Sequence, residues 1–317
     1  MKWMVTGGAG YIGSHVVREL LKHGCEVYVI DNLSTGLRER LPSDCHFLEI
    51  DCRDSFEIRT VIDSFLPHGI IHLAAKKQAR ESSKFPWDYW STNIGALLGV
   101  LNAAFNSSVR HIIQSSSCSI YGSAKSVSES SVFNPQSTYG WTKAISERIL
   151  EAFSKQAQVP VTSLRYFNVI GCDDFSFSFD NSSECLVPIT INRINNDEPV
   201  LIYGNNFQTE DGTALRDYLD VRDLASAHIL ATKNPPIANL YLPLNVATGE
   251  PVSVKKMVDL IFEIFEVHEH PINFLNANPE DPAAIWAIPS ETLVSWGWTP
   301  KHNLVKSLTD HKKNLTN

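Results

Sequence analysis

Hydrophobic and polar positions change in regular blocks along the first half of the chain. Short apolar runs predict buried strands at residues 2–6, 26–30, 46–50, 69–74, 110–114 and 161–165. The segments between them carry apolar residues at helical spacing, as residues 11–22 do with Ile12, Val16 and Leu20. Strands that alternate with helices form a parallel sheet covered on both faces, so the pattern predicts a doubly wound α/β (Rossmann) fold.

The pattern loosens after residue 166. It predicts short strands at 200–203 and 240–246 and helices near 186–195, 220–232 and 252–266. Residues 171–185 have no period and many small polar residues, which indicates a loop of functional length. We therefore expect a larger unit of residues 1–166 plus about 219–246 and a smaller, discontinuous α/β unit of about 167–218 plus 247–317. A ligand cleft is expected between the two units.

A longer helix is predicted over residues 86–106, with Pro86 in its first turn. Its apolar stripe consists of Trp87, Trp90, Ile94, Leu97, Leu98 and Leu101. We expect much of this stripe to pack on the sheet.

Four glycines lie within residues 6–13, where the first predicted strand turns into the first predicted helix. Such a turn lets backbone N–H groups approach a pyrophosphate at a helix N-terminus. Asp31 ends the second strand about 20 residues further on, where a carboxylate would bond the adenosine ribose of NAD. No arginine directly follows Asp31, which favours NAD over NADP, although Arg38 and Arg40 leave the point open. The larger unit is therefore predicted to bind NAD.

Composition excludes several other classes of protein. The chain has 317 residues, 43% of them hydrophobic, which supports a sizeable core. Its net charge of −8 and lack of a basic block argue against a nucleic-acid partner. No signal peptide or membrane span is visible. The six cysteines form no C-x-x-C pair, so neither a zinc site nor a disulfide framework is indicated, and a reducing cytoplasm is expected.

Tyr139 and Lys143 carry the candidate chemistry. Side chains four residues apart share one face of a helix, so the lysine can favour ionisation of the phenol. A phenol whose pKa falls below its usual value of about 10 becomes a usable base near neutrality. Ser117 follows the predicted strand at 110–114, and a serine at the carboxyl end of such a strand points into the ligand crevice.

Over almost its whole length the chain resembles the extended short-chain dehydrogenase/reductase superfamily and, within it, the UDP-glucose 4-epimerases. The motifs that carry the resemblance are Thr6–Gly13 with Ser14 and His15, Asp31–Leu33, Ile71–Ala75, Ser115–Ser117 ahead of Tyr121 and Gly122, Tyr139 with Lys143, Leu164–Asn168, and Thr209–Thr213 through Arg216–Tyr218. The last of these is the most specific for the epimerases.

The resemblance implies NAD-dependent epimerisation at C4 of a nucleotide sugar such as UDP-glucose or UDP-galactose, through a 4-keto sugar. Tyr139 would remove the proton of the 4-hydroxyl, Ser117 would bond the 4-oxygen, and Lys143 would hold the nicotinamide ribose. It also implies a homodimer in which helix 86–106 and the helix of Tyr139 pair with their copies.

Further site residues follow from the same resemblance. Those expected at the NAD are Gly7, Gly10, Tyr11, Ile12, Gly13, Asp31, Asn32, Leu33, Ser34, Thr35, Gly36, Asp51, Cys52, Leu73, Ala74, Ala75, Lys77, Asn93, Ser115, Tyr139, Lys143 and Phe167. Those expected at the nucleotide sugar are Lys77, Ser117, Ser119, Tyr139, Asn168, Leu186, Tyr203, Arg216 and Ile285. Arg216 would pair with the diphosphate.

The chain departs from the family pattern near the substrate. Cys185 replaces an expected asparagine, and residues 276–281 lack the second diphosphate arginine. Ile285 is smaller than the tyrosine of strict glucose/galactose enzymes, which predicts a pocket wide enough for UDP-N-acetylhexosamines. The loop at 171–185 is also shorter than in typical members.

Other activities on this scaffold need groups that differ here. Nucleotide-sugar dehydratases carry an Asp-Glu pair where this chain has Cys118 and Ser119, so epimerisation is favoured. The alternatives are a 4-epimerase of another nucleotide sugar, such as a UDP-hexuronic acid or a specialised biosynthetic intermediate, and a non-catalytic NAD-binding sensor.

Overall fold

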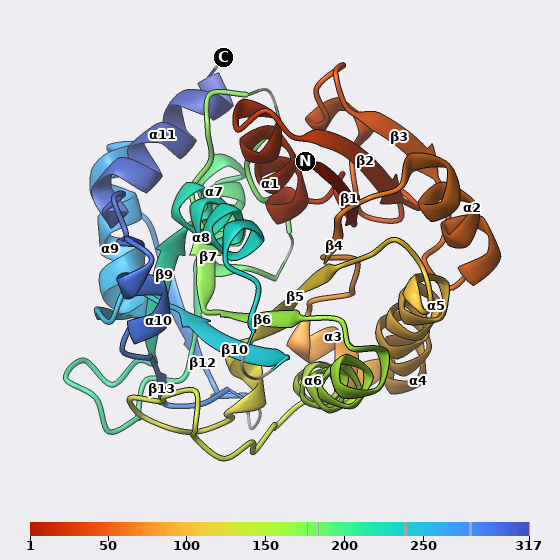
Figure 1. Cartoon of the computed structure of the whole chain (residues 1–317). Helices are drawn as coiled ribbons and strands as arrows, with labels where there is room; N and C mark the ends of the chain where they lie inside the picture. Colours follow the sequence, from red (N-terminus) through yellow and green to blue (C-terminus); the bar gives the residue numbers. More distant parts are fainter. Residues whose placement is uncertain (176, 183, 238–239, 279–280, 317) are drawn as a thin grey trace.

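A seven-stranded parallel sheet forms the centre of the larger part of the molecule (Figure 1). The computed structural model describes residues 1–175, 177–182, 184–237, 240–278 and 281–316. The strands of the sheet are β1 (Lys2–Thr6), β2 (Glu26–Asp31), β3 (His46–Glu49), β4 (Gly69–His72), β5 (His111–Ser117), β6 (Val161–Tyr166) and β10 (Tyr241–Val246). They lie in the order β10-β6-β5-β4-β1-β2-β3, and every pairing is parallel. The predicted fold class is confirmed.

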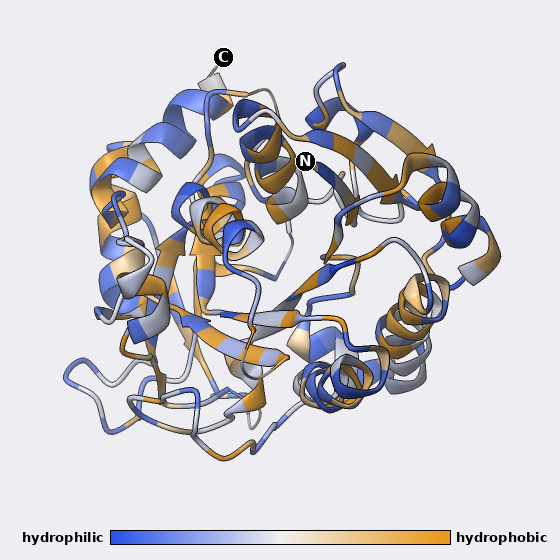
Figure 2. Ribbon diagram, in the orientation of Figure 1, coloured by the Kyte–Doolittle hydropathy of each residue, from blue (hydrophilic) through white to orange (hydrophobic). Residues whose placement is uncertain are grey.

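Helices cover both faces of this sheet. The helices on one face are α1 (Tyr11–Lys22) and α8 (Val221–Lys233), and those on the other are α2 (Ser55–Phe65), α5 (Gly95–Ala104) and α6 (Thr138–Ala157). Trp3 and Val5 of β1 pack into the first layer and Met4 into the second, because successive side chains of a strand point to opposite faces. Apolar colour on the central strands in Figure 2 reflects this burial on both sides.

The predicted helix over 86–106 is interrupted. It consists of α4 (Pro86–Tyr89), a π-helical turn η2 (Trp90–Ile94) and α5. Asn93 in the turn accepts a hydrogen bond from the Lys76 nitrogen at 2.8 Å and donates to the Thr142 hydroxyl at 3.0 Å. These contacts tie the π-helical turn to the segment after β4 and to α6. The stripe packs only in part, because Leu97 is buried while Trp87 is 81% exposed.

The smaller part contains two further sheets. One is built from β7 (Asn168–Ile170), β9 (Leu215–Asp220), β11 (Pro251–Ser253) and β13 (Ala284–Ile285), and the other from β8 (Val200–Tyr203) and β12 (Ile272–Leu275). Its helices are α7 (Leu186–Asn195), α9 (Val254–Phe265), α10 (Glu291–Ser295) and α11 (Leu304–Thr316). Shorter helices elsewhere are α3 (Ala79–Lys84), η1 (Arg38–Arg40) and η3 (Cys118–Ile120). The proposed division of the chain into two units stays a prediction.

The described residues contain neither a membrane-spanning helix nor a cluster of metal ligands. None of the described helices is long and apolar enough to cross a membrane. Nor does the described part of the chain gather three or more His, Cys, Asp or Glu side chains that could hold a metal ion. All six cysteines are free thiols.

Candidate active site

The turn between β1 and α1 requires its glycines. Gly7 has a φ of +71°, and a Cβ atom there would lie 2.6 Å from the Ala74 nitrogen. A Cβ at Gly13 would lie 2.1 Å from the Gly7 carbonyl oxygen. Helix α1 begins directly after Gly10. No side chain of the described residues caps this end of the helix, so the N–H groups of its first turn can bind an anion. The turn therefore fits the pyrophosphate of a dinucleotide.

Asp31 stands beside this turn, at the end of β2. Its carboxylate is 7% exposed and accepts hydrogen bonds from the Ala9 nitrogen at 3.0 Å and the Leu33 nitrogen at 2.9 Å. Burial raises the pKa of Asp31, and these hydrogen bonds oppose the rise. The carboxylate is thus fixed where a ribose of NAD would meet it.

One of the two arginines that left the choice between NAD and NADP open is engaged elsewhere. Arg40 donates from Nε to the Phe177 carbonyl at 2.8 Å and from Nη2 to the Phe179 carbonyl at 3.0 Å. Arg38 is exposed, and its guanidinium stacks over the ring of Phe47 at 4.8 Å. The buried Asp31 carboxylate favours NAD.

The other predicted cofactor residues gather at the carboxyl edge of the sheet. They follow β2 (Asn32, Leu33, Ser34, Thr35 and Gly36), β3 (Asp51 and Cys52) and β4 (Leu73, Ala74, Ala75 and Lys77), or lie in β5 (Ser115). Asp51 pairs with Arg53 at 2.8 Å, and this hydrogen bonding lowers its pKa to about 2. A crevice outside the carboxyl ends of parallel strands is where such folds bind ligands.

The three predicted catalytic side chains lie together at the start of α6. Ser137 caps the helix by accepting from the Gly140 nitrogen at 3.1 Å. Lys143 is 5% exposed, and its Nζ donates to the Ser115 carbonyl oxygen at 2.8 Å and lies 5.9 Å from the centre of the Tyr139 ring. Ser117, at the end of β5, lies close enough to Tyr139 to lower the pKa of the phenol, and its hydroxyl donates to the Ser119 hydroxyl at 3.1 Å.

The expected lowering of the Tyr139 pKa is wrong for these surroundings. Burial raises the pKa of Tyr139 to about 12, although Ser117 works against the rise. Burial also lowers the pKa of Lys143 to about 8, opposed by the Glu147 carboxylate one turn further along α6. The lysine donates to Ser115 rather than to the phenol, so its charge does not offset the burial of Tyr139.

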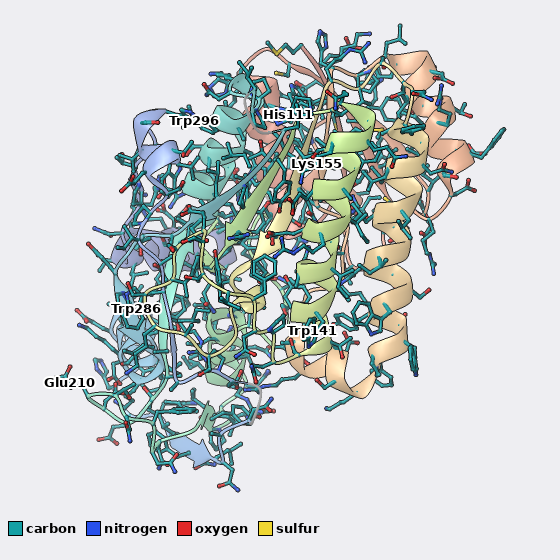
Figure 3. All side chains as sticks on the ribbon, turned by 60° about the horizontal axis from the view of Figure 1, so that its bottom comes forward. His111, Trp141, Lys155, Glu210, Trp286 and Trp296 are labelled. Carbon is teal, nitrogen blue, oxygen red and sulfur yellow. The ribbon has the colours of Figure 1, made fainter. Side chains whose placement is uncertain are left out.

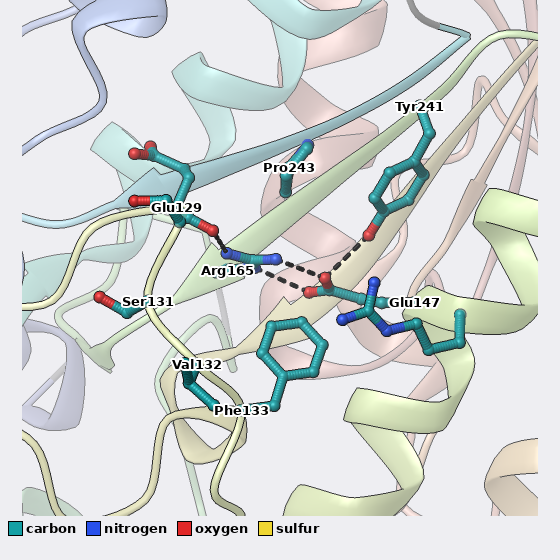
Figure 4. Close-up of a pocket in the computed structure, with 10 residues that line it drawn as sticks. Glu129, Ser131, Val132, Phe133, Glu147, Arg165, Tyr241 and Pro243 are labelled. Atoms are coloured by element: carbon teal, nitrogen blue, oxygen red, sulfur yellow. Dashed lines mark hydrogen bonds and ion pairs between the residues drawn. The ribbon is translucent and has the colours of Figure 1, made fainter.

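Glu147, one turn after Lys143 on α6, belongs to a buried polar network with Arg165 and Tyr241 (Figure 4). Arg165 binds it through two hydrogen bonds, Nη2 to Oε2 at 2.6 Å and Nε to Oε1 at 2.9 Å. Tyr241 donates to the same carboxylate at 2.8 Å. A cavity of about 330 Å³ adjoins the network, lined by Glu129, Ser130, Ser131, Val132, Phe133, Glu147, Arg148, Arg165, Tyr241 and Pro243. The sequence alone did not single out Glu147, although its four-residue spacing from Lys143 is the signal that could have found it.

Predicted substrate residues come mostly from the smaller part of the molecule. Arg216 in β9 is paired with Ile285 in β13, and its guanidinium donates to the Leu215 carbonyl at 2.8 Å. The neighbouring Asp217 carboxylate accepts hydrogen bonds from the backbone nitrogens of Thr248 and Gly249, each at 2.9 Å. Asn168 lies in β7, Leu186 begins α7 and Tyr203 ends β8. Ile285 is 3% exposed and packs in one apolar cluster with Phe167.

Two features near the catalytic group were not expected. Lys77 pairs with Asp180 at 2.8 Å. Asp180 lies in the loop that follows residue 171, so no local spacing predicts this contact. Tyr11 donates to the Gly171 carbonyl at 2.7 Å, which ties the glycine turn to the same loop.

Cys118, beside Ser117, has its pKa raised to about 12 by burial, so it remains a thiol and packs as a small apolar residue.

Comparison with known proteins identifies the family of the chain. Residues 3–246 match the NAD dependent epimerase/dehydratase family, and the chain belongs to it. Among its relatives, a UDP-glucose 4-epimerase of Lactobacillus helveticus is 34% identical over 310 residues, which cover 96% of this chain and 94% of that enzyme. A UDP-glucose 4-epimerase of Corynebacterium glutamicum is 33% identical over 313 residues, which cover 98% of this chain and 94% of that enzyme.

Solved structures of similar enzymes carry the cofactor. The UDP-glucose 4-epimerase of Stenotrophomonas maltophila, with bound NAD and formylated UDP-arabinopyranose, has a TM-score of 0.92 at 28% identity and covers 100% of this chain and 98% of that one. The NAD complex of the Thermus thermophilus enzyme has a TM-score of 0.90 at 29% identity and covers 100% of this chain and 99% of that one.

Proposed function

We propose that the chain catalyses the NAD-dependent interconversion of UDP-glucose and UDP-galactose at C4. The observation that carries the proposal is the convergence of Ser117, Tyr139 and Lys143 beside the glycine turn. A tyrosine and a lysine on one helix next to a dinucleotide fold provide a base, a cation and a bound redox partner. The family relationship supports the same reaction.

Tyr139 acts as the base that takes the proton of the sugar 4-hydroxyl, and Ser117 holds the 4-oxygen. NAD, held by the glycine turn and Asp31, would supply the acceptor and then the donor of the C4 hydride. Lys143, with a pKa of about 8, is mainly protonated at neutral pH, and its positive charge favours the phenolate when it turns toward Tyr139. Glu147 helps to keep this lysine protonated.

The residues around the hexose leave room for a second candidate. Ile285 stands where a larger tyrosine would narrow the pocket, and Cys185 replaces an amide. This favours N-acetylhexosamines as additional substrates, or another UDP sugar in place of glucose. The absence of an arginine from residues 276–281 also bears on which nucleotide sugar is bound.

Incubation of the purified protein with five UDP sugars tests these proposals. The substrates are the nucleotide derivatives of glucose, galactose, N-acetylglucosamine, N-acetylgalactosamine and glucuronic acid, and chromatography scores conversion to the C4 epimer. We expect conversion of the glucose pair and of the N-acetyl pair. Turnover of glucose alone would contradict the wide pocket, and turnover of the uronic acid alone would identify the alternative substrate.

Loss of the Asp31 carboxylate is expected to weaken NAD binding by about tenfold or more, since a charge-assisted hydrogen bond contributes about 1.5 to 3 kcal/mol. The variant is Asp31→Ala, and the measurement is the NAD retained after gel filtration together with its dissociation constant. Asp63→Ala removes a surface carboxylate that pairs with Arg59 on α2 and serves as the control. Unchanged NAD retention in Asp31→Ala would refute the ribose contact.

We also propose a homodimer formed through α4, α5 and α6. Large apolar side chains are exposed on these neighbouring helices, with Trp87 at 81%, Leu98 at 50% and Trp141 at 48%. Figure 3 shows Trp141 near the start of α6, with α5 running alongside. A second copy of the same face would bury these side chains.

The proposed location is the cytoplasm. All six cysteines are free, and Cys45 and Cys52 are buried, so the fold does not depend on an oxidising compartment.

A further inference from the structure

Arg80 lies between two parts of the candidate site. It is the second residue of α3, three positions after Lys77 and two before Ser82. The Ser82 hydroxyl accepts a hydrogen bond from the Tyr139 nitrogen at 3.0 Å, so α3 packs against the start of the catalytic helix. The side chain of Arg80 therefore starts close to the reacting groups and extends from there.

Its guanidinium contacts two residues of the smaller part of the molecule. The Arg80 Cζ atom lies 3.9 Å from the centre of the Tyr203 ring, at the end of β8. Arg80 also donates from Nη2 to the Asp281 carboxylate at 3.0 Å. Asp281 precedes β13 by three residues, and β13 is paired with the strand that carries Arg216. Arg80 thus contacts Asp281 in the segment just before β13, and Arg216 lies in the strand paired with β13.

The charge of a diphosphate favours a second cationic side chain in addition to Arg216. A diphosphate carries about two negative charges and is best held by guanidinium groups, which bind phosphate oxygens through two N–H groups at once. Arg216 supplies one such group, while Lys77 is already paired with Asp180. A guanidinium has five N–H groups. The Arg80 side chain is 33% exposed and gives one nitrogen to Asp281, so other N–H groups can bind a ligand.

We propose that Arg80 binds the diphosphate of the nucleotide sugar and takes the place of the arginine that residues 276–281 lack. The stack on Tyr203 and the bond to Asp281 hold the guanidinium in position before the substrate arrives. This inference rests on the proposed function, because it assumes a nucleoside diphosphate sugar as substrate.

Calorimetric titration of the NAD-loaded protein with UDP, UMP and uridine tests the assignment. For Arg80→Gln we expect the affinity for UDP to fall by about tenfold to a hundredfold and the affinity for uridine by less than about threefold, because only the diphosphate loses a charged partner. UMP should lie between the two. Arg59→Gln is the matched control, since Arg59 also pairs with an aspartate but lies on α2.

Two further variants separate ligand binding from a purely structural contact. Asp281→Asn removes the ion pair and keeps the arginine and its stack on Tyr203, so its affinity for UDP should fall much less than that of Arg80→Gln. Arg80→Lys keeps the charge but loses the fork and the stack, and its affinity for UDP should fall less than that of Arg80→Gln. The lysine variant decides the question if the glutamine variant does not retain NAD.

Several results would overturn the proposal. Equal losses for UDP and uridine would mean that Arg80 supports only the nucleoside end. An Asp281→Asn variant as weak as Arg80→Gln would mean that the contact is structural. Unchanged UDP affinity in both Arg80 variants, with epimerase activity intact, would refute this inference alone. Wild-type protein that holds NAD but neither binds UDP nor converts a UDP sugar would refute the proposed function as well.

Discussion

Replacing Tyr139 by phenylalanine is expected to abolish turnover, with a loss in kcat of about a thousandfold or more. The substitution removes the phenol oxygen that takes the proton and leaves the ring, the backbone bond to Ser82 and the cap of α6 in place. NAD content should therefore stay at the wild-type level. The measurements are kcat for UDP-galactose and the bound NAD released on denaturation.

Tyr28→Phe is a matched control, since Tyr28 lies in β2 and stacks on His46, away from the catalytic group. A Tyr139→Phe variant with near-normal kcat would contradict the assignment of the base. Loss of activity together with loss of NAD would mean that the phenol mainly supports the cofactor.

Replacing Lys143 by methionine is expected to remove both activity and tight NAD binding, and also to change how stability depends on pH. Burial lowers the pKa of Lys143 from 10.5 to about 8 in the folded protein. Between these two values the unfolded chain binds a proton that the folded chain has released. Stability of the wild type relative to the variant therefore rises as the pH increases from about 8 to about 10.5, and the cost of burying the charge is present in full below about pH 8.

Thermal unfolding of both proteins at pH values from about 7 to about 10 measures this difference. Relative to the wild type, the variant should be most stable at the low end of this pH range. The difference in free energy of unfolding between the two proteins should change by up to a few kcal/mol across the range, as the shift in the pKa of Lys143 dictates. A difference in Tm that does not change with pH would contradict a buried, titrating lysine. Lys155→Met, an exposed substitution on the same helix, is the control.

Local patterns predicted the parts of the fold that depend on local spacing. The bounds of α1, α7 and β8 agree with the structure because an apolar period and its breaks define them within the segment itself. The π-helical turn at Trp90–Ile94 could not be predicted in this way, since Asn93 meets Lys76 and Thr142, which come from distant segments. Tertiary contacts there override the helical period.

The candidate site shows the same distinction. Spacing along the chain brought Tyr139 and Lys143 to one helix face, but it could not show that burial raises the pKa of Tyr139 to about 12. It also could not place Asp180 against Lys77 or Arg80 against Tyr203, because these pairs are more than a hundred residues apart. Residue types and motifs predicted the chemistry, and long-range packing determines the charges around it.

The position of β10 constrains how the protein can fold during synthesis. Residues 241–246 form β10, the strand beside β6. The five other strands of the sheet lie on the far side of β6 and all come before it in the chain. While the ribosome is still adding the smaller part of the molecule, β6 has one open edge with unpaired N–H and C=O groups. The sheet can be completed only after more than three quarters of the chain has been made, when residues 167–218 of the smaller part are already present and residues 247–317 are still to come.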